Sequence, residues 1–497
     1  MSRLVDKKIV WCVILMTLLC AFTLVFHIMD RGRVCNVKLE SEERLLQICA
    51  GKDYIAHADN AKDLLLFENQ AIPYDEASNS FYICQDIRQK EYRGTITAAS
   101  ENIAIWMLED DYAYEFAEAL RQSHSFSVWI ATQDSYTICK IVFTGLPVVV
   151  LDTQEKAGMQ YIQGAIHVWN PMDEEIGTIS CKKGDAEIKC SQSMETYTVK
   201  FMNKEGNEHR KLSVLDMGKY DAWKLYEVSK QDMTYIRSML AYLVWNRINV
   251  GERLDRPCRY AEVIINGEYS GLYLLAPRID ENYLDLEENG KVVSIDMRRD
   301  GTGESATTGA TENTGAKRVV APENNVGNIY EAEAFRFDNL VEYFLFLEMT
   351  YAFENVANDF YVAWDEEQGQ TFLLPGKIEY SFGIFPNRLQ YMTWRAQERM
   401  LTPELVDLAA KEGVAEDGDL EQRMGERYRE LRKETISDDA LFKLVDELQA
   451  YLCESGYIAR SGANKDGENH YEEKIGELIR YLTERMEVLD KYYGTEG

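Results

Sequence analysis

Two strand-like runs that meet at an Asn-Gly dipeptide constrain the fold of this chain most. Residues 259–275 are rich in β-branched and aromatic side chains, and Asn266-Gly267 interrupts them near the middle. The dipeptide tolerates the positive φ angles of a two-residue type I′ turn, so the stretch predicts a tight β-hairpin. In that register Glu262 lies opposite Gly271, where the missing side chain would let another backbone or a ligand approach closely. An ordinary sheet hairpin without a binding role is the alternative.

The charge of the chain limits its partners. Its 497 residues include 84 acidic and 54 basic side chains, which gives a formal net charge of −30. Such a surface repels phosphate backbones, so nucleic acid is not an expected partner. The hydrophobic share of 46% is enough for large cores and predicts two or three structural units.

An apolar run near the N-terminus predicts a membrane anchor. Residues 9–29 are almost entirely apolar and about as long as a bilayer is thick. Arg3, Lys7 and Lys8 precede the run, which favours a cytoplasmic N-terminus. We therefore expect an uncleaved signal anchor, a single-pass location in the cell membrane and a large extracytoplasmic domain. A removed signal peptide is the alternative.

Changes in residue pattern along the chain predict its domains. Residues 1–34 form a cytoplasmic stub with the anchor, and residues 35–144 contain short strand-favouring runs that predict a β-rich spacer domain. Residues 145–497 form the main domain, whose part from about residue 396 carries apolar stripes at helical spacing. The cysteines outside the anchor are widely scattered, so disulfides and free buried thiols both stay open.

The hairpin sequence EVIINGEYSGLYLL resembles the central signature of the CotH kinase family, and the resemblance extends over roughly residues 145–493. Members of this family resemble atypical, secreted or surface protein kinases that transfer phosphate from ATP. The resemblance implies an α+β fold: an atypical protein-kinase-like two-lobed domain, with a preceding β-rich unit and an N-terminal transmembrane helix. ATP and Mg²⁺ are the cofactors that it implies.

Two polar loops resemble the catalytic machinery of the family. They flank a predicted hairpin that turns at Gly369, and this layout brings them together as the base and metal loops of kinases are. Pro375, Ser381, Phe382 and Gly383 fit the second loop of the family. The resemblance implies catalytic roles for Glu354 and Asn358, cofactor binding by Lys377, and metal binding by Glu379 and Asn358.

The chain departs from the family at the expected phosphate-binding cations. Met194 and Glu195 stand where the family has two lysines. Lys189 or Lys200 could substitute, or both could be solvated strand residues. Arg237 lies within the apolar stripe of a predicted helix, where a guanidinium needs a carboxylate or phosphate partner. We predict that Arg237 binds the cofactor; a flank position from which its head reaches water is the alternative.

Two functions follow from the resemblance. The first is a membrane-anchored, surface-exposed kinase-like protein that transfers phosphate from ATP to exported or coat proteins. The second is a pseudokinase that acts as a structural, adhesion or scaffold protein at the cell or spore surface. Lys377, which places a positive charge in the metal loop, favours the second.

Overall fold

The computed structural model describes most of the chain. The described residues are 16–17, 32–57, 61–113, 115–191, 196–249, 254–286, 290–295, 335–356, 358–365, 367, 369–384, 399–400, 419–463 and 470–494.

The N-terminal unit is built on two sheets. The larger has the strand order β1-β2-β9-β10-β11-β7-β6, with β3 paired to β11, and the smaller has the order β5-β4-β8. Its strands are β1 Arg33–Val34, β2 Val37–Glu40, β3 Asp53–Tyr54, β4 Leu65–Phe67, β5 Gln70–Ala71, β6 Tyr74–Asp75, β7 Ser80–Cys84, β8 Ile96–Ala98, β9 Ala104–Leu108, β10 Ser125–Ala131 and β11 Ser135–Thr144. The helices are α2 Glu42–Ile48 and α3 Phe116–Arg121, with 3₁₀ turns at Ala61–Asp63 and Glu109–Ala113.

The next strands close into a barrel. Their order is β12-β13-β14-β15-β18-β20-β19, and the ring closes because β12 pairs with β13 on one side and with β19, in parallel, on the other. The bounds are β12 Val148–Thr153, β13 Ile162–Asp173, β14 Thr178–Cys190, β15 Thr196–Phe201, β18 Ala222–Glu227, β19 Arg259–Ile265 and β20 Glu268–Pro277. Every second residue points inward, so Ile188, Val199 and Leu225 share one buried core. A short pair, β16 Leu212–Ser213 and β17 Lys219–Tyr220, lies outside the ring.

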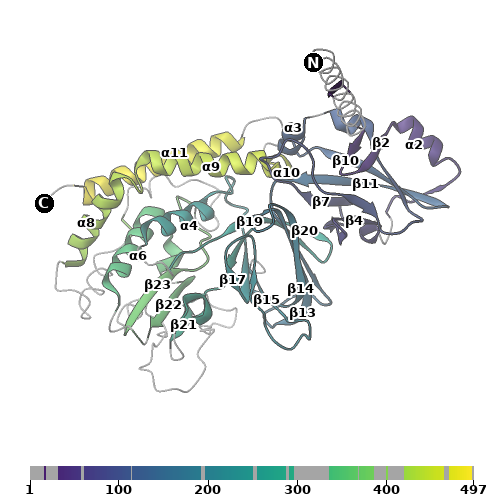
Figure 1. Cartoon of the computed structure of the whole chain (residues 1–497). Helices are drawn as coiled ribbons and strands as arrows, with labels where there is room; N and C mark the ends of the chain where they lie inside the picture. The colour runs from purple at the N-terminus through teal and green to yellow at the C-terminus, as the bar shows by residue number, and fades with distance from the viewer. Residues whose placement is uncertain are drawn as a thin grey trace, which may run out of the picture.

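The remainder combines helices with a small sheet, β21-β22-β23. Its elements are α4 Arg237–Ile248, α5 Glu281–Leu284, β21 Lys291–Ile295, α6 Phe337–Thr350, a 3₁₀ turn at Phe353–Val356, β22 Phe360–Asp365, β23 Gln370–Pro375, α8 Asp419–Lys433, α9 Asp438–Glu454, α10 Tyr457–Ser461 and α11 His470–Tyr493. Helices α9 and α11 lie side by side along the molecule, with α10 reaching the N-terminal unit (Figure 1). Ser437 caps α9 by accepting from the Ala440 amide at 3.2 Å, as its sequence predicts.

The predicted hairpin is β19–β20, and its turn is confirmed. Asn266 and Gly267 have φ angles of 51° and 79°, and Ile265 pairs with Glu268 across them. The predicted register is wrong by one residue, because a bulge between Val263 and Ile264 places Val263 opposite Gly271. Glu262 therefore faces Leu272.

Glu262 instead joins the three parts of the molecule. Its side chain is fully buried and accepts from Arg460 of α10, with Nη2 to Oε2 at 2.7 Å and Nε to Oε1 at 3.2 Å. The Tyr269 hydroxyl donates to it at 2.6 Å, and Thr144 of β11 also donates to it. Arg460 reaches Ser123 of the N-terminal unit at 2.8 Å. We call this group the Glu262 junction.

The predicted two-lobed α+β fold needs correction in its β-rich lobe. That lobe is a closed barrel in a mixed α/β structure, and the small β21-β22-β23 sheet lies beyond it among helices. The alternation of residues along a strand indicates its two faces, but it does not indicate that β12 also pairs with β19. The predicted domain boundary at residue 145 stays a prediction; β11 ends at Thr144 and β12 begins at Val148.

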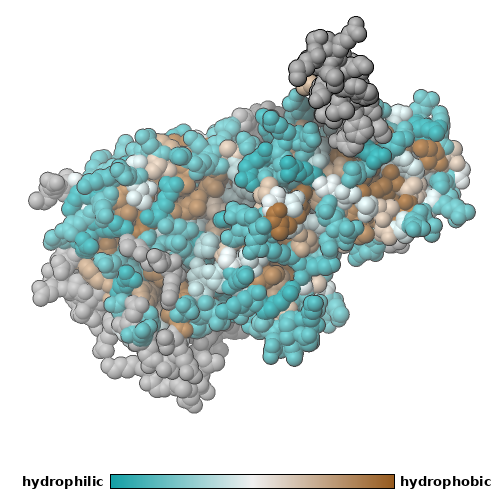
Figure 2. Space-filling view, viewed as in Figure 1, coloured by the Kyte–Doolittle hydropathy of each residue, from teal (hydrophilic) through white to brown (hydrophobic). Residues whose placement is uncertain are grey.

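The predicted transmembrane helix is not supported. Within the described ranges, none of the helices combines the length and the apolar character that crossing a bilayer requires. Even the long helix α11 is apolar on one face alone, with Glu472, Glu473 and Lys474 in its first turns. Residues 9–29 themselves lie outside the described residues, apart from Met16 and Thr17. The surface of the described part is largely hydrophilic, with small apolar patches, one of them over the N-terminal unit near α2 (Figure 2).

Candidate functional site

The first polar loop follows α6 and carries the two predicted catalytic residues. Helix α6 stops at Thr350 because Tyr351 takes a left-handed conformation, with φ at 52°. The chain then makes the 3₁₀ turn Phe353–Val356, which holds Glu354. The Asn358 amide donates to the Glu354 carbonyl at 2.6 Å, so the two residues lie one turn apart.

The second loop leaves β23 and lies against the first, as the intervening hairpin predicts. The Asn355 amide group donates to the carbonyls of Asp359 and Lys377 at 2.7 and 3.1 Å. The Gly376 amide also donates to Asp359 at 2.7 Å, and a Cβ atom at Gly376 would lie only 2.3 Å from that carbonyl oxygen. Glycine at position 376 is therefore required by this contact between the loops.

Lys377 and Glu379 form an ion pair within the second loop. The Lys377 ammonium lies 2.7 Å from the Glu379 carboxylate, and the side chains are 7% and 9% exposed. The residue predicted to bind the cofactor thus neutralises the residue predicted to bind the metal. At this burial the pair is stabilised by the low local dielectric, so separating it needs a competing charge.

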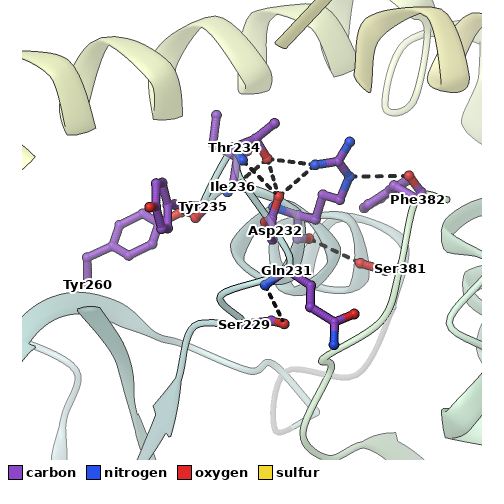
Figure 3. Close-up of polar contacts among 10 residues, drawn as sticks. Ser229, Gln231, Asp232, Thr234, Tyr235, Ile236, Tyr260, Ser381 and Phe382 are labelled. Carbon is purple, nitrogen blue, oxygen red and sulfur yellow. Dashed lines mark hydrogen bonds and ion pairs between the residues drawn. The ribbon is translucent and has the colours of Figure 1, made fainter. Parts of the chain in front are cut away.

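Arg237 begins α4 and is held by the turn before it (Figure 3). Its Nη1 atom donates to Asp232 at 2.6 Å and to Thr234 at 2.9 Å, and its Nε atom donates to the Phe382 carbonyl at 3.3 Å. The guanidinium is therefore buried with a carboxylate partner, and it fixes the end of the second loop to α4. Cofactor binding by Arg237 stays a prediction.

A group of cations lies on the outer face of the barrel. The sequence indicates two of them, Lys189 and Lys200, but not the others. Register places Lys189 of β14 opposite Thr198 and Thr198 opposite Lys224 of β18, so both lysines share the face turned away from the barrel core. Lys200 follows Thr198 on the same face. The Lys189 and Lys200 ammonium groups each lie 4.8 Å from the centre of the Tyr161 ring.

Arg278 completes this group at the end of β20, where its amide donates to the Ala222 carbonyl at 3.0 Å. We call Lys189, Lys200, Lys224 and Arg278 the cation face. Burial lowers the pKa of Lys189, and the positive charges of Arg278, Lys224 and Lys200 lower it further. Asp280, 4.0 Å from Arg278, offsets part of this positive charge, and an anion bound beside Lys189 would offset more.

The cation face is connected to the second loop through tyrosines. The Lys224 ammonium lies 5.7 Å from the centre of the Tyr361 ring on β22. The buried Arg256 guanidinium lies 6.0 Å from that ring and 5.6 Å from the Tyr242 ring. The Tyr242 hydroxyl in turn donates to the Gly376 carbonyl at 2.7 Å. Burial raises the pKa of Tyr361, but Lys224 and Arg256 outweigh it and lower that pKa overall.

Comparison with known families decides the identity. The model of the CotH kinase protein family matches residues 183–489, from within β14 to nearly the end of α11. The chain belongs to the CotH kinase family. The match includes the cation face and both loops. Among curated proteins, none matches the chain.

CotH membership suggests use of ATP and a metal in general. The described residues fit these two cofactors to different degrees. Among them, no group of three or more His, Cys, Asp or Glu side chains is placed to hold a metal ion. Mg²⁺ prefers several hard oxygen ligands, whereas Glu379 is paired with Lys377. The second loop as it stands does not fit the ion. The cation face, in contrast, fits the phosphates of a nucleotide.

Proposed function

We propose that this CotH-family protein binds the polyphosphate group of a nucleoside triphosphate on the cation face and is a kinase-like phosphotransferase. The observation that carries the proposal is the gathering of Lys189, Lys200, Lys224 and Arg278 on one barrel face of a chain with a net charge of −30. Cations held next to one another against the overall charge raise the local affinity for an anion.

The position of the face also supports transfer chemistry. Outward residues of β18 and β20 pack against the helical part: Tyr226, Leu274 and Ala276 belong to its core. A polyphosphate on this face would therefore lie toward the loops that carry Glu354, Asn358 and Glu379. The lysines would offset the charge that develops on the phosphate oxygens during transfer. Glu354 is the carboxylate that the first loop offers to accept the proton of an attacking hydroxyl.

The acceptor in this proposal is a Ser, Thr or Tyr hydroxyl of an exported or coat protein. A second candidate function is that of a pseudokinase scaffold, which the Lys377–Glu379 ion pair favours because it occupies the carboxylate of the metal loop. Both candidate functions include nucleotide binding, but only the kinase transfers a phosphoryl group.

Calorimetry with the full chain and ATP tests the shared step. Lys189→Met and Lys200→Met should each weaken binding at least tenfold, since a charge-assisted hydrogen bond contributes about 1.5–3 kcal/mol. Lys183→Met is the matched control, because this lysine lies exposed on the same strand as Lys189. Undiminished binding by both variants would place the nucleotide elsewhere.

Transfer of labelled phosphate to the chain itself and to hydroxyl-bearing peptides separates the two candidates. Transfer that depends on Glu354 and Glu379 supports the kinase. Binding without transfer supports the scaffold. Absence of nucleotide binding in the wild type would refute both the nucleotide site and the kinase function.

A further inference from the structure

The N-terminal unit contains a hollow whose residues are far from the cation face along the sequence. It has a volume of about 430 Å³ and lies at one end of strands β9 and β10. Its walls include Lys52, Asn102, Ala104, Trp106, Gln133 and Asp134. The volume falls within the range of about 300–1,000 Å³ that is usual for small-molecule sites.

Strand register creates the hollow. Trp106 pairs with Trp129 across β9 and β10, and Ala104 pairs with Ala131 in the next row on the same face. A row of two large indole side chains is thus followed by a row of two methyl groups. The difference in size leaves a depression in the sheet surface that is nearly as deep as a side chain. Trp129 is covered, since it packs with Leu45 of α2, whereas Trp106 is partly exposed and forms a wall.

The rim of the hollow is fixed before any ligand binds. The Lys52 ammonium donates to the Gln133 carbonyl at 2.8 Å and also to that of Thr132. The Asp53 amide donates to the Asp134 carbonyl at 2.9 Å. The turn between β10 and β11 is therefore tied to the segment after α2. A rim ordered in advance lowers the entropy lost on binding.

The rim offers both kinds of hydrogen-bonding group without net charge. The amides of Asn102 and Gln133 donate and accept, the Asp134 carboxylate accepts and the Lys52 ammonium donates. Lys52 and Asp134 carry opposite charges that cancel. A phosphate or a polyamine would find one of the two repulsive, whereas an uncharged ligand would not.

We infer that this hollow binds a neutral sugar ring. A pyranose presents C–H groups that pack on an aromatic wall such as Trp106, by dispersion contacts. Its hydroxyls each donate and accept, which matches the mixed rim of amide, carboxylate and ammonium groups. The small, exposed Ala104 leaves the room that such a ring needs. The ring belongs either to a glycan chain or to a free sugar.

The full chain should be titrated with neutral oligosaccharides of glucose, xylose and N-acetylglucosamine, and with the corresponding free sugars. Binding is followed by calorimetry and by tryptophan fluorescence, to which Trp106 is one of eight contributors. We expect at least one of these ligands to bind with a Kd of about 1 mM or tighter. Tighter binding of the oligomer than of its free sugar identifies a glycan chain as the source, and equal binding identifies the free sugar.

Two substitutions at exposed positions test the location without disturbing the core. Ala104→Phe fills the hollow and Asn102→Ala removes a rim amide, and each should weaken binding at least tenfold. Ala71→Phe is the matched control, since Ala71 is also an exposed strand alanine and lies outside the hollow. Wild-type affinity in Ala104→Phe overturns the inference. So does a failure of all the neutral sugars to bind with a Kd of about 1 mM or tighter, or tighter binding of a sugar phosphate than of its neutral parent.

Discussion

Replacing Arg460 by methionine tests whether the Glu262 junction holds the parts of the molecule together. The Glu262 side chain is 0% exposed and that of Arg460 12%, and two hydrogen bonds join them. Removing one partner of a buried ion pair costs about 3–5 kcal/mol, because the other charge is left without compensation. Tyr269 and Thr144 would still donate to the carboxylate, so we expect about 3 kcal/mol.

The loss should appear in urea denaturation as a lower midpoint at an unchanged slope. Glu262→Gln combined with Arg460→Met should cost less than the sum of the single changes, with a coupling of about 1.5 kcal/mol or more. Lys443→Met is the control, since its exposed pair with Glu447, at 3.8 Å, should leave the midpoint nearly unchanged. An Arg460→Met variant that is as stable as this control, or an additive cycle, would refute the reasoning.

Three further predictions concern the hairpin, a half-buried histidine and the second loop. Gly267→Val should cost about 1 kcal/mol or more in thermal unfolding, because φ is 79° there and the new Cβ would lie 2.9 Å from Glu76. Burial lowers the pKa of His167, so the folded state binds fewer protons than the unfolded state below about pH 6.5, and stability should rise with pH up to that value. His167→Gln should flatten this rise, and an unchanged pH profile would contradict the assignment. Lys377→Asp should increase the affinity for Mg²⁺ measured by calorimetry with ATP present, because it frees Glu379 and adds a carboxylate; equal or weaker affinity would show that the ion pair does not limit the site.

Local chemistry explains which parts of the fold the sequence predicts. Asn266-Gly267 determines its own turn, because few dipeptides accept two positive φ angles. The bulge between Val263 and Ile264 carries no comparable signal, since both residues fit a regular strand equally well. Because the sequence does not indicate the bulge, the predicted partner of Glu262 is wrong by one residue. For the same reason the sequence does not indicate that Glu262 belongs to a junction and not to an open position.

The candidate site likewise has parts that the sequence predicts and parts that it does not. The sequence predicts that the two loops meet, because one hairpin separates them, and Asn355 joins them. The cation face combines Lys189 with Lys224, which come together only through the pairing of β14, β15 and β18. Strand pairing is a long-range property, so a single sequence shows that both lysines point outward but not that they are neighbours. Arg237 illustrates a different limit, because the sequence predicts that it needs a carboxylate or phosphate partner but does not indicate that this partner is Asp232.

The Glu262 junction also determines the order in which a nascent chain can complete its fold. Arg460 bonds to Ser123 over a sequence separation of 337 residues. At about 5–20 residues per second, roughly 17–67 s pass between the synthesis of these two residues. Through that interval Thr144 of the N-terminal unit can already donate to Glu262, but the carboxylate lacks its guanidinium partner. The Glu262 charge therefore stays without its ion-pair partner on the ribosome until α10 emerges, and late formation of this long-range contact is the expected course of folding.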